Sequence, residues 1–91
     1  MHAVVIRVTI NDEESATAQL REQVVPRVSQ APGFVSGYWT RSAENNRGLS
    51  MIVFESQEAA EGAKQAIDSE GLPNDAVTID SVEVREVVAS A

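Results

Sequence analysis

Aromatic side chains gather behind a helix-breaking step in this chain. Three of its four aromatic residues, Phe34, Tyr38 and Trp39, follow Pro32-Gly33 in a run that is typical of a strand. A Pro-Gly step ends a helix. The run therefore predicts that the chain leaves a helix here and enters a strand, next to a possible binding site for a flat apolar molecule. Tyr38 and Trp39 could each stack on an aromatic ligand, and Tyr38 could also transfer a proton. As neighbours in a strand they point to opposite faces, and the alternative role for both is that of interface anchors.

Two further residues complete the candidate ligand-binding set. Phe54 ends another apolar run, where it could stack on a ligand or simply fill the core. Arg7 lies among Val residues in the first strand, where a guanidinium needs a carboxylate or an anionic ligand. We expect Arg7 to form an intersubunit ion pair with Glu83 or Glu86, with substrate binding as the alternative.

Motifs of the common enzyme classes are missing from the sequence. The chain has no Cys, which excludes a disulfide, a thiolate zinc site and a cysteine nucleophile. It has no Gly-x-Ser-x-Gly, HExxH or phosphate-loop motif. The acidic run Asp12-Glu13-Glu14 lacks the spacing and the glycine of a calcium loop. We therefore assign no catalytic residue and predict no metal and no cofactor.

Length and charge restrict the remaining possibilities. With 91 residues and 43% hydrophobic content, the chain predicts one globular domain over residues 1–91. Its net charge of −7 disfavours nucleic-acid binding, which needs Lys and Arg to replace the counterions of phosphate. The longest apolar runs have four residues, too few for a signal-peptide core or a membrane span. These features predict a cytoplasmic protein without a membrane or nucleic-acid partner.

Hydrophobic periodicity predicts six elements. Asn11 is the expected cap of a first helix, Pro26 should kink or loosen that helix, and Ser56 should cap a second helix that Gly71 ends. The last strand changes its alternation near Ser81, which predicts a bulge. In order, the elements are a strand over 3–10, a helix to about residue 30, strands over 33–42 and 48–55, a helix between Ser56 and Gly71 and a strand over 77–88.

This order predicts a βαββαβ ferredoxin-like fold of the α+β class, with a four-stranded antiparallel sheet and both helices on one face. The third strand is apolar on both sides, and two helices cannot cover both faces of one sheet. We expect Val5, Val35 and Trp39 to add to the face that the helices leave bare. Because a large exposed apolar patch marks an interface, we predict a homodimer through this sheet face.

The segments around the two helices resemble a known family. Pro26 late in the first helix, the run Ala31-Pro32-Gly33-Phe34, and Ile52-Val53-Phe54-Glu55-Ser56-Gln57-Glu58-Ala59 are similar to the antibiotic-biosynthesis monooxygenase-like group of dimeric α/β-barrel proteins. The resemblance implies a homodimer with a pocket between helices and sheet in each subunit. Some members oxidise polycyclic aromatic substrates without metal or flavin, and others degrade haem held by a His. The single His of this chain is His2, at the start of the first strand.

Two hypotheses of function follow. The first is a dimeric α/β-barrel that binds a small apolar or aromatic ligand in a cleft between helices and sheet, with a narrow pocket expected beside the second helix. The alternative is a cofactor-independent monooxygenase that oxidises a polycyclic phenol, whose own anion supplies the electron to dioxygen. In that enzyme Tyr38, Trp39 and Arg7 would transfer a proton, stack on the ring and stabilise the phenolate.

Overall fold

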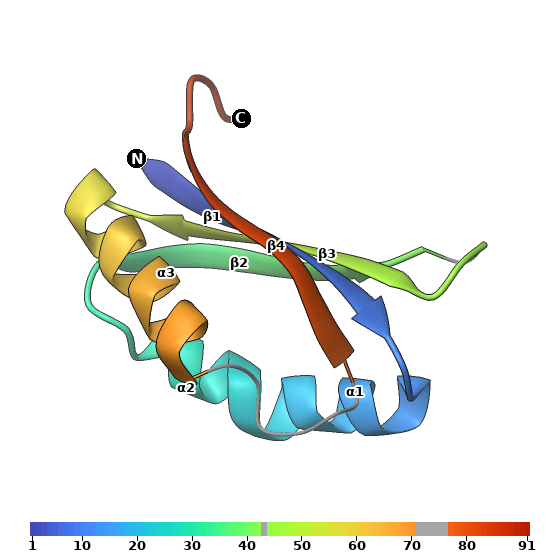
Figure 1. The fold of residues 1–91 in the computed structure, drawn as a ribbon. Helices are drawn as coiled ribbons and strands as arrows, with labels where there is room; N and C mark the ends of the chain where they lie inside the picture. Colours follow the sequence, from blue (N-terminus) through green and yellow to red (C-terminus); the bar gives the residue numbers. More distant parts are fainter. Residues whose placement is uncertain (43, 71–76) are drawn as a thin grey trace.

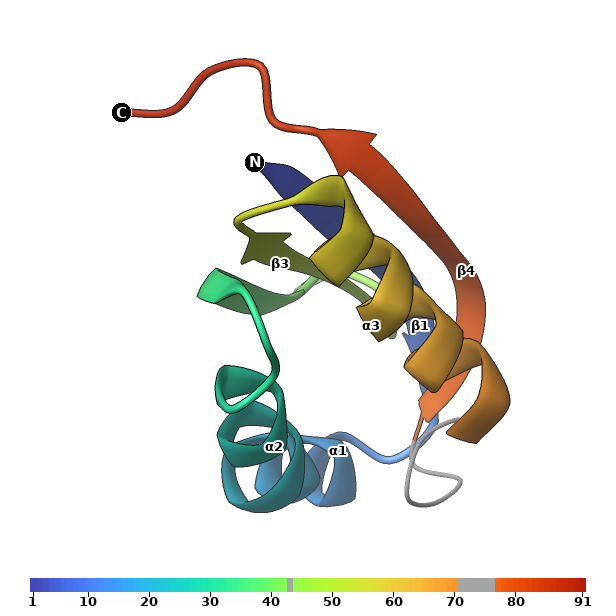
Figure 2. The same cartoon turned by 90° about the vertical axis from the view of Figure 1, so that its left-hand side faces the viewer.

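One four-stranded antiparallel sheet organises the molecule, seen in a computed structural model that describes residues 1–42, 44–70 and 77–91 (Figure 1). The strands lie in the order β2-β3-β1-β4, and two helical runs lie on one side of the sheet (Figures 1 and 2). This arrangement confirms the predicted ferredoxin-like βαββαβ fold. The bounds in chain order are β1 (His2–Ile10), α1 (Glu13–Gln19), the π-helical turn η1 (Leu20–Val24), α2 (Val25–Ser29), β2 (Phe34–Arg41), β3 (Arg47–Phe54), α3 (Gln57–Glu70) and β4 (Val77–Glu86).

The first helical run is capped one residue later than predicted. Asp12, not Asn11, is the N-cap, and its carboxylate accepts hydrogen bonds from the Ser15 backbone N–H at 3.2 Å and from its hydroxyl at 3.1 Å. Asn11 instead donates to the Thr78 hydroxyl at 3.0 Å, which ties the end of β1 to β4. A carboxylate at this position also suits the positive end of the helix.

Pro26 shapes the middle of the same run. The ring lacks a backbone N–H and presses on the preceding turn, so a regular α-helix cannot pass through it unchanged. The turn just before it, η1, is π-helical, with the Val25 N–H bonded to the Leu20 carbonyl. The predicted loosening therefore occurs in the turn ahead of Pro26, and the helical run still reaches Ser29.

The second helix, α3, packs closely against the segment that precedes β2, where both carry small residues. As predicted, Ser56 caps α3, its hydroxyl accepting from the Ala59 N–H at 3.1 Å. A Cβ built on Gly33, whose φ is +79°, would lie 2.8 Å from the Ala59 Cβ. Only glycine fits here, because a side chain would both clash and strain the backbone. The predicted stop at Gly71 lies outside the described residues.

Two bulges set which side chains face the helices. In β2 the register shifts between Phe34 and Ser36, which leaves Val35 unpaired. Trp39 therefore faces the helices, and its predicted place on the bare face with Val35 was wrong. A second shift leaves Asp80 unpaired in β4, which confirms the bulge predicted near Ser81.

The core lies between β1, β3 and the helical runs. Its most buried members are Val4, Ile6, Ile52, Phe54 and Ala60, all with 9% or less of their surface exposed. Phe54 is 1% exposed and meets Phe34 edge to face at 6.3 Å between ring centres. Among the described residues, no helix is both long and apolar enough to cross a membrane.

Replacing Phe54 with Ala should destabilise the fold, because the substitution leaves a cavity in the most buried part of the core. We expect the free energy of unfolding to fall by about 3–5 kcal/mol in urea denaturation at fixed protein concentration. Val88→Ala is the control, since Val88 is 87% exposed, and should change stability by no more than about 0.5 kcal/mol. Equal effects of the two substitutions would contradict this placement of Phe54.

Candidate functional site

An apolar cavity of about 110 Å³ lies between the first helical run and the sheet. Its helical wall carries Leu20, Val24 and Val28, the four-residue stripe expected on the inner side of a helix. From α3 it receives only Ile67, so the cavity lies mainly under the first helical run. The sequence predicts a pocket beside the second helix instead. Its lining consists of Ile6, Val8, Ala16, Gln19, Leu20, Val24, Val28, Trp39, Ser50, Ile52, Ile67, Val77 and Ile79.

The π-helical turn η1 contributes to this cavity. A π turn widens the helix and changes the direction in which its side chains leave the backbone, and such turns are frequent at functional sites. Leu20 and Val24, at the two ends of η1, line the cavity, while Arg21 and Glu22 between them line the groove outside it. Pro26 thus acts on the site indirectly, through the turn that precedes it.

Trp39 lies where the cavity meets the surface. Trp39 lines both the cavity and a larger groove of about 810 Å³ outside it. Of the two adjacent aromatic residues, Tyr38 and Trp39, it is therefore Trp39 that faces a pocket. Gly37 makes room for its ring: a Cβ built there would lie 2.8 Å from the indole Cη2 and 2.9 Å from Cζ3. The missing side chain at Gly37 therefore fixes where the indole lies.

The outer groove is bordered by charged residues that the sequence analysis does not assign to a ligand site. Arg41, at the end of β2, donates to the Glu13 carboxylate at the start of α1, and both side chains line the groove. Glu14, Arg21 and Glu22 line it as well. One sequence signal was available for Arg41: it follows Trp39 by two residues, and two-residue spacing in a strand places side chains on the same face.

The other three predicted site residues lie away from the cavity. Tyr38 is 66% exposed on the opposite face of the sheet, where it pairs with Met51. Phe54 lies in the core and is not among the described residues that line the cavity. Arg7 is also on the open face, opposite Leu49 of β3. The structure therefore brings only Trp39 of the four to the cavity.

Arg7 has a partner within its own chain. Its Nη1 donates to the Glu83 Oε1 at 2.8 Å, and Arg85 Nη2 donates to the same oxygen at 2.9 Å. The sequence predicts an intersubunit pair, but β1 and β4 are neighbours and their register places Glu83 beside Val5, diagonal to Arg7. The hydrogen bond from Arg7, followed by that from Arg85, lowers the pKa of Glu83 from its ordinary value.

His2 occupies a less exposed place than its position near the chain start suggested. Its ring is half-buried, opposite Phe54 on one side and Glu86 on the other. Its Nδ1 is buried without a hydrogen-bond partner among the described residues. The cavity lining does not include it, and within the described residues no three His, Asp or Glu side chains are grouped to hold a metal ion.

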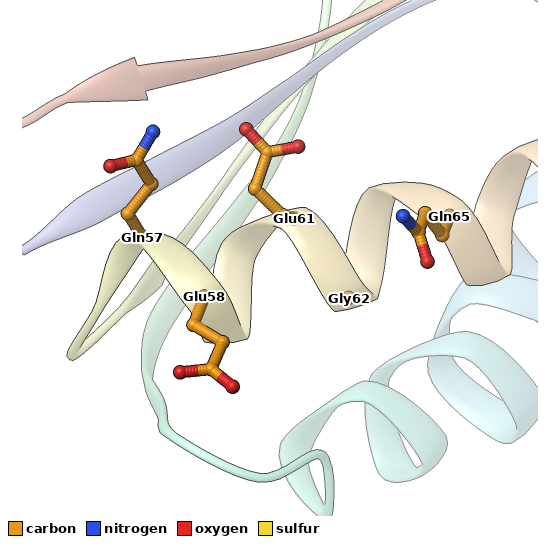
Figure 3. Close-up of a pocket in the computed structure, with 5 residues that line it drawn as sticks. All are labelled: Gln57, Glu58, Glu61, Gly62 and Gln65. Carbon is orange, nitrogen blue, oxygen red and sulfur yellow. The ribbon is translucent and has the colours of Figure 1, made fainter.

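The outer side of α3 forms a separate, shallow surface. Gln57, Glu58, Glu61, Gly62 and Gln65 line it, and Figure 3 shows them along the helix. All five are exposed. A polar, open surface of this kind is typical of the solvent-exposed side of a helix, and it lacks the concave, apolar character of a ligand site.

Replacing Arg7 with Gln should raise the pKa of Glu83 toward its ordinary value, since the largest cause of its lowering is removed. Arg85→Gln is the matched comparison and should raise that pKa by less. Because a lowered carboxyl pKa stabilises the fold above the unfolded-state pKa, the pair's contribution is lost only as pH falls through the folded-state value. Carboxyl ¹³C NMR titration measures the pKa of Glu83 in each variant. A Glu83 titration that is unchanged in Arg7→Gln would contradict the ion pair.

Comparison with known proteins identifies relatives in structure but not in sequence. No family model matches the chain, and no curated protein matches it. A candidate antibiotic biosynthesis monooxygenase from Deinococcus radiodurans matches with a TM-score of 0.66 at 18% identity, over 100% of this chain and 96% of that one. A dimeric ferredoxin-like protein from an uncultured marine organism matches at 0.63 and 15%, over 100% and 98%. The haem-degrader MhuD of Mycobacterium tuberculosis, with two haems in its active site, matches at 0.59 and 24%, over 97% and 98%. These likenesses show that the chain shares the ferredoxin-like fold of these proteins.

Proposed function

We propose that the protein binds a small apolar or aromatic ligand in the cleft formed by the cavity and its outer groove. The observation that carries this proposal is the cavity itself. Protein interiors are close-packed, with few voids larger than a water molecule, yet a domain of 91 residues keeps about 110 Å³ of apolar space open. Dry apolar cavities of similar order bind small aromatic molecules.

The cavity and the groove adjoin each other. They share six lining residues, with Trp39 among them, so in our proposal a ligand that enters the groove extends into the cavity. The deep part admits about one ring, and the groove of about 810 Å³ accommodates the remainder. The indole of Trp39 supplies a flat face on which such a ring stacks.

The lining chemistry favours binding over catalysis. The polar residues of the cavity wall are Gln19 and Ser50, and neither side chain exchanges a proton near neutral pH. Tyr38, the proton-transfer candidate of the monooxygenase alternative, lies on the opposite face of the sheet. That alternative keeps its support from the Deinococcus radiodurans relative, and oxygen uptake with the bound phenol distinguishes it from simple binding.

Filling the cavity should weaken binding. Ala16 is 8% exposed and lines both cavity and groove, so Ala16→Leu should weaken 2-naphthol binding by at least about tenfold, because the added carbons occupy the ligand's space. The indole N–H resonance of Trp39, the single Trp, reports the titration in ¹H–¹⁵N NMR.

The control is Ala66→Leu, on an exposed position of α3 that borders neither space. It should leave the affinity within about twofold. If the wild-type indole resonance does not respond to 2-naphthol, or if both variants bind as well as wild type, the cavity is not the site. Oxygen uptake in the same mixture would favour the monooxygenase hypothesis over simple ligand binding.

We further propose that the open face of the sheet pairs with a second copy of the chain. Four large apolar residues of β2 and β3 are exposed there: Val35 (48%), Tyr38 (66%), Leu49 (37%) and Met51 (40%). On the β1–β4 half of that face, Ala3 and Val5 are buried, at 2% and 3% exposed, and the Arg7–Glu83–Arg85 group lies beside them. An apolar patch of this kind can pair with its own copy about a two-fold axis, and the structurally similar marine protein is itself dimeric, which supports pairing of two copies.

A charge at the centre of the apolar half should prevent this association. Met51→Glu places a carboxylate from each subunit at the interface, and we expect sedimentation equilibrium to give a monomer, with at least about a hundredfold weaker association than wild type. Gln65→Glu adds the same charge on the outer side of α3 (Figure 3) and should remain dimeric. A monomeric wild type at micromolar concentration would contradict the proposed dimer.

A further inference from the structure

Strand β2 presents an aromatic ring and a cation side by side to the groove. Trp39 pairs with Ser50 and Arg41 pairs with Gly48, and all four residues line the groove. Two residues along a strand advance about 7 Å, so the guanidinium follows the indole along one face at a spacing that one small molecule spans. Gly48 is buried, and a Cβ built on it would lie 2.9 Å from the Val8 Cγ2, so side chains of β1 fill the space beside it.

Arg41 already holds a carboxylate across the groove. The Glu13 side chain, from the first turn of α1, accepts its hydrogen bond and so joins the helical wall to the end of β2. Both side chains are about half or more exposed, at 49% for Arg41 and 62% for Glu13. An exposed pair of this kind contributes little to stability, so a ligand carboxylate replaces Glu13 at small cost.

We propose that the ligand of this cleft is an aromatic carboxylic acid whose ring lies against Trp39 and whose carboxylate replaces Glu13 on Arg41. This inference rests on the proposed function and adds the ligand's chemical class. Arg suits the role because its planar donor pair matches a carboxylate in bidentate geometry. Glu13 then acts as an internal competitor that occupies Arg41 when the cleft is empty.

The remaining charges of the groove wall are mostly acidic. Glu14 and Glu22 also border the groove and repel an anion that is not held by a cation. Arg21, from η1, is the second cation of the groove wall. A cationic ligand would instead pair with Glu14 or Glu22, and it would leave the Glu13–Arg41 bond in place.

Two probes of the same shape test the inference. 2-Naphthoate carries the carboxylate, and 2-naphthylmethanol is its neutral counterpart; both are titrated against the Trp39 indole N–H resonance. We expect wild type to bind naphthoate more tightly. Arg41→Gln should weaken naphthoate by about tenfold and leave naphthylmethanol within about twofold, because only the charged hydrogen bonds are lost.

Glu13→Gln separates a specific anchor from a general loss of structure. Removing the competitor should strengthen naphthoate binding by about threefold or more, the opposite sign to Arg41→Gln, without affecting the neutral probe. Arg47→Gln, at an exposed position on the other face of the sheet opposite Thr9, is the charge-matched control and should change neither affinity.

The outcomes divide cleanly. Equal wild-type affinities for the two probes, or equal losses of both in Arg41→Gln, would overturn the carboxylate assignment and leave the binding cleft standing. Binding of neither probe would overturn the cleft itself and the assignment with it. Opposite shifts for naphthoate in the two variants, with the neutral probe unchanged, support the assignment.

Discussion

The packing of one row of branched side chains on β1 against two helical runs is the constraint on which the rest of the molecule depends. Val4 and Ile6 are at the centre of this row and are almost fully buried. Around them β3 and α3 pack closely, through Ile52, Phe54 and Ala60. Farther along the row, at Val8, the helical cover comes from η1, whose widened turn does not fill the space. Packing is tightest toward Phe54 and Ala60, and the cavity lies toward Val8, with Ile6 and Ile52 on its wall.

Much of this arrangement can be predicted from local sequence patterns. Alternating apolar residues predict β1 and β3, Ser56 predicts the start of α3, and the changed alternation near Ser81 predicts the β4 bulge. These features depend on neighbours within a few residues. For that reason the order of elements and the antiparallel sheet could be predicted without any knowledge of tertiary contacts.

The site was predicted less completely, because it depends on longer-range geometry. The bulge at Val35 reversed the side on which Trp39 was expected, and no local alternation shows where a strand drops one residue from pairing. Phe54 and Arg7 were chosen by residue type, yet burial places one in the core and strand order places the other beside Glu83. The Arg41–Glu13 contact joins residues 28 positions apart and only the fold brings them together.

The unpaired residue in β2 also bears on how this chain tolerates changes of length. Val35 adds a residue that has no partner on β3, so losing or gaining one residue at that point leaves the downstream pairing intact. A deletion between Ser36 and Tyr38 has a different consequence, because it would turn the indole outward and the phenol inward. Natural variants of this protein should therefore accumulate insertions and deletions before Ser36 and conserve the residue count from there to Arg41.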